Sequence, residues 1–410
     1  MKKDLFDLSN DQLKEIAATL QGRIKDGLEK ENQEILAIPT YINPKTDIVN
    51  EKALVLDLGG TNCRVAIVEF RDGKPTIHPM NGWKKDLSQV MKKPGATQEE
   101  LFKEIADMVS TLNLEGVTSI GYCFSYPGGS TLDGDATLIR WTKGVNIQEM
   151  IGRPVGKDLM DYLNKYLKGK TTFTNIKVIN DTVASLFAGL TDTSAQAYIG
   201  LIVGTGTNMA AFFPTDSIKK IDKGYKKKGL VPVNLESGNF HPPHLSVVDN
   251  KMDKYSATSG QQRFEKAISG YYLGRILEYV FSCDEFEADF DASKLTRIMS
   301  YPDMYKEEYV YWAHQIYERS AKLVAASLAG LVREMVNCDP KIKKIRLVAE
   351  GSLFWSHDRK EGAPSFKSYK DQVMEELDVL LKELGLKGVT VKVDEQENAN
   401  LIGSAIAGLS

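Results

Sequence analysis

Hydrophobic residues form two pairs of strand-like runs along the chain, and a glycine turn interrupts each pair. Residues 54–70, LVLDLGGTNCRVAIVEF, meet at Gly59–Gly60, and residues 199–213, IGLIVGTGTNMAAFF, repeat the design. Glycine allows a positive φ and a close approach of the backbone to a ligand, and the neighbouring Thr and Asn add hydrogen-bonding groups. One such turn would indicate only an ordinary hairpin. Two of them predict a duplicated fold in which each half offers a glycine turn to the same anionic ligand.

Several other segments carry apolar residues at the spacing of a helix. A start at Ser9/Asn10 precedes the first of these, a Thr97–Glu100 capping box opens the second, and Gly169 is expected to end the third. A strand also runs into a helix at Asn180–Asp181, and Pro127–Gly128 halts another strand. The pattern predicts helices over 9–31, 97–112, 157–170, 303–337 (one long helix or two consecutive ones) and 400–409, and strands within 119–128, 176–180 and 344–353.

Composition limits the class of protein. A chain of 410 residues is longer than one usual core, so we expect two domains or one domain with a large insert. Hydrophobic residues make up 42%, and a formal net charge of −3 gives no general attraction to nucleic acid or an anionic membrane. The cysteines form no CxxC pair, which favours buried thiols in a reducing compartment; they are Cys63, Cys123, Cys283 and Cys338. No apolar signal segment or membrane-spanning run is found, so we expect a cytoplasmic protein.

The glycine turns do not fit two common nucleotide-binding loops. GRPVGKD, residues 152–158, has three residues between its glycines where a Walker A loop needs four, and it lacks the hydroxyl residue. A dinucleotide fingerprint opens a helix, whereas Gly204 and Gly206 precede a strand-like run. A repeated hairpin over phosphates remains, with Asp57 before the first turn to hold metal-bound water. This arrangement indicates ATP.

Two polar stretches are interpreted as ordinary loops. The basic run KKIDKGYKKKG, residues 219–229, fits a solvated hairpin or loop better than an anion site. His241 and His244, in the stretch HPPH, have no nearby cysteine or carboxylate cluster, so we expect loop residues rather than a metal pair.

Seven segments, in order, resemble those of the hexokinase family of the sugar kinase and actin-like ATPase superfamily. DLGGTNCRV resembles the first phosphate segment, FSYP with LIRWTKG the sugar-binding signature, VINDTVAS the catalytic-base segment and GLIVGTGTN the second phosphate segment; NLESGNF, SGQQRFEKAISGYYLG and RSAKLVAASLAG follow. The resemblance covers nearly the whole chain. It implies a duplicated ribonuclease-H-like α/β fold, with small and large domains around a cleft that holds a sugar and ATP with Mg²⁺.

The resemblance also implies a domain division. We expect an N-terminal helix and connecting arm over 1–50 that pack on the large domain. A small α/β domain would cover 51–180, joined by the helix at about 399–410, and a large α/β domain would cover 181–398.

Family roles carry over to individual residues. Asp181 matches the general base that accepts the proton of the sugar hydroxyl, although an Asp after Asn180 would by itself equally fit a helix cap. Lys143 matches a sugar and phosphate contact that offsets charge in the transition state. The other matched sugar ligands are Ser125, Thr142, Asn180, Asn208, Glu236 and Glu265. The matched phosphate and nucleotide contacts are Asp57, Gly59, Gly60, Thr61, Asn62, Arg64, Gly204, Thr205, Gly206, Gly351 and Ser352, with Mg²⁺ carried on ATP and contacting Asp57 only through water.

Three departures from the family pattern bear on specificity. Ser237 follows Glu236 where familiar members carry Trp, which leaves the preferred sugar open. The adenosine motif is loosely matched by residues 349–352, and EQENANLIGSA replaces the usual glycine-rich turn before the last helix.

The predicted activity is ATP-dependent phosphorylation of glucose or a similar hexose at the 6-hydroxyl, by a monomer or homodimer with neither nucleic-acid nor membrane partners. Alternatives are a hexose-sensing regulator without turnover, a kinase for mannose, fructose or N-acetylglucosamine, and a filament-forming ATPase. The presence of Asp181 and Lys143 argues against the regulator, and the sugar segments argue against the filament former.

Overall fold

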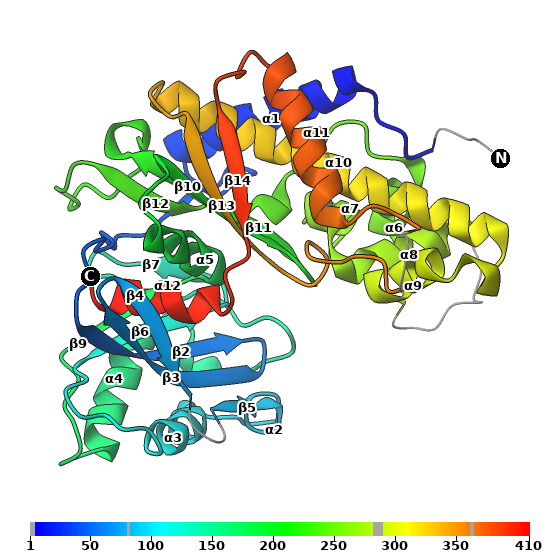
Figure 1. Ribbon diagram of the computed structural model, residues 1–410. Coiled ribbons are helices and arrows are strands. Elements are labelled where there is room, and N and C mark those ends of the chain that lie inside the picture. Colours follow the sequence, from blue (N-terminus) through cyan, green and yellow to red (C-terminus); the bar gives the residue numbers. More distant parts are fainter. Residues whose placement is uncertain (1–4, 80–82, 282–289, 361–364) are drawn as a thin grey trace.

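The computed structural model describes residues 5–79, 83–281, 290–360 and 365–410, so Cys283 lies outside the described residues. Two mixed sheets organise the chain into two lobes (Figure 1). The small lobe contains the sheet β4-β3-β2-β6-β9, with β5 on β3, the hairpin β7/β8 and helices α2–α4; the large lobe contains the sheet β1-β12-β11-β10-β13-β14, α1 and α6–α11.

The two sheets follow the same plan. In each, an antiparallel hairpin, β2/β3 or β10/β11, is extended on the side of its first strand by two parallel strands. The predicted duplication is therefore confirmed. The strands are β1 Ile38–Pro39, β2 Glu51–Gly59, β3 Asn62–Arg71, β4 Lys74–His78, β5 Lys84–Asp86, β6 Ser119–Phe124, β7 Gly128–Ser130, β8 Ala136–Leu138, β9 Asn175–Ile179, β10 Ala197–Val203, β11 Thr207–Pro214, β12 Leu230–Asn234, β13 Lys344–Glu350 and β14 Thr390–Asp394.

Helices alternate with the sheets in layers (Figure 1). Helices α3 and α4 cover the outer face of the small sheet, and α1, α10 and α11 lie on the outer side of the large one. The helices are α1 Asn10–Glu29, α2 Ser88–Met91, α3 Gln98–Val109, α4 Val155–Tyr166, α5 Asp181–Ala188, α6 Val247–Lys254, α7 Arg263–Ile268, α8 Gly270–Phe281, α9 Ala292–Ser300, α10 Glu307–Cys338, α11 Tyr369–Glu383 and α12 Ala399–Gly408.

The layer between the sheets is formed by two exchanged helices. Helix α5 follows β9 of the small sheet but packs on β10, β11 and β13 of the large one. Helix α12 follows β14 of the large sheet but packs on β2, β6 and β9 of the small one, and it lies against α5. Alternate residues of β2 therefore belong to two different hydrophobic cores. Leu54 and Leu56 pack on the side of α3 and α4, whereas Ala53 and Val55 pack on the side of α12.

Backbones approach closely in this shared layer. A Cβ placed on Gly121 of β6 would lie 1.8 Å from the carbonyl oxygen of Ser404, and one on Gly403 would lie 1.8 Å from that of Ala184. Such distances leave no room for a side chain. Helix α12 is therefore held between β6 and α5 by glycine contacts on both sides.

Helix starts agree with their sequence signals more closely than helix ends. Ser9 with Gln12, and Thr97 with Glu100, form complete capping boxes for α1 and α3. The prediction that Gly169 ends its helix was wrong in position, since α4 ends at Tyr166, although Gly169 has a φ of +86°. The stretch predicted over 303–337 is one long helix, α10, which follows a short turn and ends at Cys338.

The two polar stretches lie outside the helices and strands. Lys220 differs from a solvated lysine, because its side chain is 5% exposed and contacts Glu31 at 3.4 Å; burial lowers its pKa. His244 Nε2 lies 2.8 Å from Glu15 Oε2. In the described part of the chain, no helix is both long and apolar enough to span a bilayer.

Candidate active site

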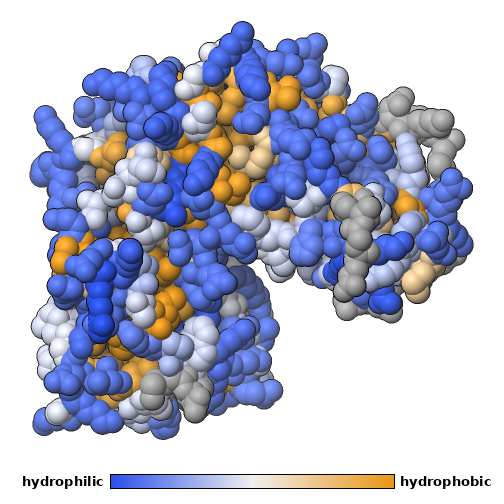
Figure 2. Space-filling model, in the orientation of Figure 1, coloured by the Kyte–Doolittle hydropathy of each residue, from blue (hydrophilic) through white to orange (hydrophobic). Residues whose placement is uncertain are grey.

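A deep notch separates the small lobe from the part of the large lobe that contains α6–α9 (Figure 2). Charged side chains of the two lobes interact electrostatically across this notch. Burial raises the pKa of Glu265 and of Glu236 in the large lobe, and the charges of Lys143 and Arg140 in the small lobe oppose these rises. Basic residues of the small lobe thus influence two predicted sugar ligands of the large lobe.

The first glycine turn joins β2 to β3. Gly60 has a φ of +64°, and the Tyr126 hydroxyl donates a hydrogen bond to its carbonyl oxygen. Thr61 lies beside it: its carbonyl oxygen accepts from the Leu87 N–H at 2.7 Å, and its hydroxyl hydrogen-bonds to the Asp86 carboxylate. Asn62 begins β3 with an exposed side chain. The turn thus keeps a fixed backbone with polar groups at the surface.

Asp57 and Arg64 are paired directly across this hairpin. Arg64 Nε donates to Asp57 Oδ2 at 2.8 Å, and the Asp57 side chain is 7% exposed. Burial raises the pKa of Asp57, and the Arg64 guanidinium opposes that rise. Asp57 is therefore a buried carboxylate whose charge is stabilised mainly by Arg64.

The loop that carries Thr142 and Lys143 packs beside the same turn. Lys143 has a φ of +58°, and its Nζ lies 3.5 Å from the carbonyl oxygen of Ser125 and 5.6 Å from the ring centre of Tyr126. The Ser125 N–H donates to Leu58 at the end of β2. Positive φ in a lysine is uncommon, and Lys143 is exposed, with its Cδ 3.8 Å from where a Cβ on Gly60 would lie.

Asp181 is the first residue of α5, at the start of the layer between the lobes. Asn180 is the cap residue, since its Oδ1 accepts from the Thr182 N–H at 2.9 Å; Asp181 Oδ1 also accepts from that group at 2.8 Å. Asn180 thus supplies the capping function that Asp181 could have served. Burial is the main cause that raises the pKa of Asp57, of Glu350 and of Glu236, and the charge of Asp181 adds to each rise. Asp181 lies among carboxylates from both hairpin regions.

The second hairpin supplies a chain of polar side chains. Asn208 Nδ2 donates to Asn234 Oδ1 at 2.8 Å, and Asn234 Nδ2 donates to Glu236 Oε1 at 2.7 Å. Glu236 has a φ of +54°, and burial raises its pKa. The Ser237 N–H donates to Asn208 Oδ1 at 3.1 Å. Asn234 was not predicted; its only signal was its place two residues before Glu236.

Glu265 lies against the second glycine turn. The Thr207 N–H donates to Glu265 Oε2 at 3.0 Å, and a Cβ on Gly206 would lie 2.6 Å from that oxygen. Burial raises the pKa of Glu265, and the Thr207 N–H opposes this rise. Gly206 therefore links the predicted phosphate turn to the predicted sugar ligand.

The turn after β13 closes on the same hairpin. Gly351 has a φ of +111°, and a Cβ there would lie 2.2 Å from the Val203 carbonyl oxygen, so only glycine fits. The Gly270 N–H at the start of α8 donates to the Gly204 carbonyl oxygen at 2.7 Å. Thr205 and Ser352 are exposed at this junction. The predicted nucleotide contacts of the second half thus lie together.

Glu350 is a further site residue that its motif did not single out. It ends β13, and its pKa is raised to about 7, chiefly by burial; the charges of Asp181 and Asp57 add to this rise and the Arg64 guanidinium opposes it. The Asn400 backbone N–H of α12 hydrogen-bonds to it. A carboxyl group with a pKa raised by burial thus lies near the Asp57–Arg64 pair of the first hairpin.

The described residues contain no preformed group of side chains that could bind a metal ion by itself. Within the described ranges, no cluster of three His, Cys, Asp or Glu side chains is placed to hold a metal ion. Asp57 and Glu350 nevertheless lie near Arg64, and Asp181 influences both, so carboxyl oxygens are available to a cation carried in by an anionic ligand.

Comparisons with known proteins agree with this architecture. Family models described as hexokinase match residues 2–190 and 198–283. The human hexokinase HKDC1 is 32% identical over 293 residues, 67% of this chain and 31% of that protein, and baker's yeast hexokinase-1 is 31% identical over 294 residues, 68% of this chain and 59% of that protein. The matches thus span less than two thirds of either relative.

Solved structures extend the likeness to the whole chain. A hexokinase from Schistosoma mansoni, described as complexed with glucose, aligns with a TM-score of 0.78 at 25% identity, covering 100% of this chain and 97% of that one. With both family models matched in order and both lobes aligned, the chain belongs to the hexokinase family.

Proposed function

We propose that this protein transfers the γ-phosphoryl group of ATP to the 6-hydroxyl of a hexose. The position of Asp181 carries the proposal. It begins α5, directly after β9 of the small sheet, and α5 packs on β10, β11 and β13 of the large sheet. The start of α5 thus lies where the two lobes meet. A base for this transfer has to reach both substrates.

The chain's own residues supply the steps of the transfer. Asn208, Glu236 and Glu265 would hold the sugar hydroxyls, and Ser125 and Thr142 would close over them from the small lobe. Asp181 would accept the proton of the 6-hydroxyl as that oxygen attacks the γ-phosphorus and the bond to ADP breaks. Lys143 would offset the charge that develops on the transferred group.

Mg²⁺ would enter with the nucleotide. Asp57 is the proposed contact, through water, because it is a buried carboxylate beside the first glycine turn. When bound, the ion screens the phosphate charges. The remaining phosphate contacts would be the backbone and hydroxyl groups of the two turns.

Glucose is the first substrate to test, because the Schistosoma protein is described as a glucose complex. Ser237 beside Glu236 leaves mannose, fructose and N-acetylglucosamine as competing substrates. A coupled assay for ADP with ATP and this panel of sugars tests the proposal. Phosphorylation of at least one hexose is expected. Sugar binding without turnover would instead support the regulator, and ATP turnover with filaments would support the filament former.

We further propose a cytoplasmic monomer or homodimer.

Closure of the notch gives a second test. Because its proposed ligands come from both lobes, a sugar would favour the closed state that aligns Asp181 with ATP. We expect slow ATP hydrolysis without sugar and faster hydrolysis with xylose, which resembles glucose but lacks the 6-hydroxymethyl group. Release of inorganic phosphate measures both rates. Hydrolysis that responds to neither xylose nor glucose would contradict both the closure and the kinase assignment.

The hydroxyl groups of the two glycine turns should serve ATP rather than sugar. A hydrogen bond to a charged group contributes about 1.5–3 kcal/mol. We therefore expect Thr61→Val or Thr205→Val to raise the apparent KM for ATP by about tenfold or more, with little change in the KM for hexose. Steady-state kinetics with each substrate varied measure this. Thr205→Ser keeps the hydroxyl and should behave as wild type, and equal effects on both KM values would indicate a folding defect.

A further inference from the structure

Tyr126 contacts two predicted phosphate-binding elements of the small lobe. Its hydroxyl group donates a hydrogen bond to the carbonyl oxygen of Gly60, in the turn between β2 and β3. Its ring centre lies 5.6 Å from the ammonium nitrogen of Lys143, in the loop 139–147. The Lys143 side chain also passes close to the turn, since its Cδ lies 3.8 Å from where a Cβ on Gly60 would be. Tyr126 therefore links the first glycine turn directly to the lysine.

The hydrogen bond to Gly60 holds a peptide group of the turn. The Gly60 carbonyl and the Thr61 N–H belong to one planar trans peptide, in which the C=O and N–H bonds point in opposite directions. An anchor on the oxygen therefore also sets the direction of the N–H, which points away from the buried Tyr126. In the described part of the chain, this N–H donates to no backbone acceptor. It remains available to a ligand of the turn.

The ring of Tyr126 is fixed by two other aromatic rings. The ring centre of Phe124 lies 5.1 Å from it, and that of Trp141 lies 4.7 Å from it, edge to face. Trp141 Nε1 donates to the Ile147 carbonyl oxygen at 2.7 Å, which closes the loop that carries Lys143. The Lys143 side chain is exposed, so it would otherwise exchange between many rotamers. A fixed aromatic ring near its ammonium group favours one position of the charge.

We propose that Tyr126 is a positioning residue for phosphoryl transfer: its hydroxyl fixes the Gly60–Thr61 peptide so that the Thr61 N–H faces the phosphates of ATP, and its ring holds the ammonium group of Lys143 beside them. This inference deepens the proposed function and rests on it, because it takes Lys143 and the first glycine turn as phosphate contacts. All of these groups belong to the small lobe, so they would move together when the notch closes. Groups that are held in advance need no rearrangement during the reaction.

The hydroxyl and the ring of Tyr126 should affect different kinetic constants. Tyr126→Phe removes only the hydroxyl. The Thr61 N–H would contact phosphate before and during the transfer, so its loss of direction should raise the KM for ATP by about two- to tenfold, with kcat and the KM for hexose nearly unchanged. Tyr126→Leu also removes the ring. Because Lys143 would act on charge that develops in the transition state, kcat should then fall by about threefold or more.

A double-mutant cycle with Lys143→Met separates positioning from a general loss of structure. Met keeps an unbranched side chain but carries no charge. With Lys143 present, kcat of Tyr126→Leu should be about threefold or more below that of Tyr126→Phe. Combined with Lys143→Met, the two Tyr126 variants should have nearly equal kcat values, because no ammonium group is left to position. A ring that only maintains packing would lower kcat by the same factor in both backgrounds.

Phe124→Leu is the matched control. Phe124 is 3% exposed, as buried as Tyr126 at 5%, and its ring contacts are with Tyr122, Tyr126 and Trp141. This variant should lose stability to a similar extent as Tyr126→Leu, which urea unfolding measures. Any loss of kcat in Phe124→Leu should be the same with and without Lys143→Met.

Titration calorimetry separates this inference from the proposed function. The probe is the ATP analogue AMP-PNP, which cannot donate its γ-phosphoryl group, with Mg²⁺ and saturating glucose. Tyr126→Phe should weaken its binding by about two- to tenfold. If wild type binds AMP-PNP but phosphorylates no hexose, the proposed function is wrong, and the weaker binding in Tyr126→Phe would still support the role of the hydroxyl.

Two results would overturn the role of Tyr126 even if wild type phosphorylates hexoses normally. One is an unchanged affinity for AMP-PNP and an unchanged KM for ATP in Tyr126→Phe. The other is an equal loss of kcat from Tyr126→Leu with and without Lys143→Met. If wild type does not bind AMP-PNP, both the role of Tyr126 and the proposed function are wrong.

Discussion

Asp181→Asn is expected to lower the turnover number for hexose phosphorylation by about 10² to 10⁴-fold. The amide keeps the size of the side chain but cannot accept the proton of the 6-hydroxyl. The proposed sugar ligands remain in place, so the dissociation constant for hexose should change little. Initial rates at saturating ATP and hexose measure the first quantity, and calorimetric titration measures the second.

The structure supplies a control for misfolding in this variant. Asn180, not Asp181, caps α5, so Asp181→Asn should unfold at nearly the wild-type denaturant concentration. Asp192→Asn changes a half-buried carboxylate that lies after the same helix and accepts a hydrogen bond from the Ser194 N–H; the activity of this variant should be normal. Turnover of Asp181→Asn within a few-fold of wild type would remove Asp181 from the role of base.

Gly403→Ala and Gly121→Ala are expected to produce the largest losses of stability. Each added methyl group would lie 1.8 Å from a backbone carbonyl oxygen, that of Ala184 or of Ser404. Backbone atoms cannot move aside as a flexible side chain can, so α12 must shift away from α5 or β6. Overpacking of this kind costs about 1–3 kcal/mol and occasionally more. Urea unfolding, with the midpoint and slope compared between variants, measures the loss.

Gly22→Ala is the matched control for the glycine variants. Gly22 lies inside α1, and a Cβ there would meet no atom within 4 Å. Because Ala has a higher helix propensity than Gly, this variant should gain up to about 1 kcal/mol. Wild-type stability for Gly403→Ala would mean that α12 is not clamped between α5 and β6.

The features predicted correctly from sequence are mainly local. The hairpins at 54–70 and 199–213 and the capping boxes of α1 and α3 depend on residues a few positions apart, so their signals are complete within short windows. The position of the α4 end was misjudged because Leu167 caps the helix before Gly169 takes its positive φ. Family resemblance supplied the order of the segments, and the roles of individual site residues stay predictions.

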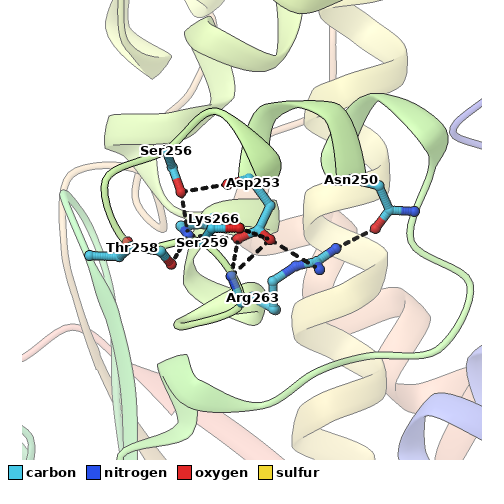
Figure 3. A network of polar contacts seen from close by, with 8 residues as sticks. Asn250, Asp253, Ser256, Thr258, Ser259, Arg263 and Lys266 are labelled. Atoms are coloured by element: carbon cyan, nitrogen blue, oxygen red, sulfur yellow. Dashed lines mark hydrogen bonds and ion pairs between the residues drawn. The ribbon is translucent and has the colours of Figure 1, made fainter.

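The unpredicted site features depend on residues that are distant in sequence. Glu350 has a raised pKa mainly because folding buries it at the end of β13, and the charges of Asp181 on α5 and Asp57 in the other sheet add to that rise. Lys266 looked like an ordinary helix lysine, yet Asp253 and the loop after α6 enclose it (Figure 3). Burial and charge arise only when the sheets and helices pack, so no local window contains them.

The exchange of α5 and α12 between the sheets has a consequence for synthesis on the ribosome. Apart from the short strand β1, the strands of the small sheet emerge before those of the large sheet, but the helix that covers their inner face, α12, is made only after every strand of the large sheet. At about 5–20 residues per second, the nascent small sheet would wait for more than ten seconds with Ala53 and Val55 uncovered. Chaperones that hold exposed apolar strands should therefore engage this chain during translation and release it once residues 399–408 are available.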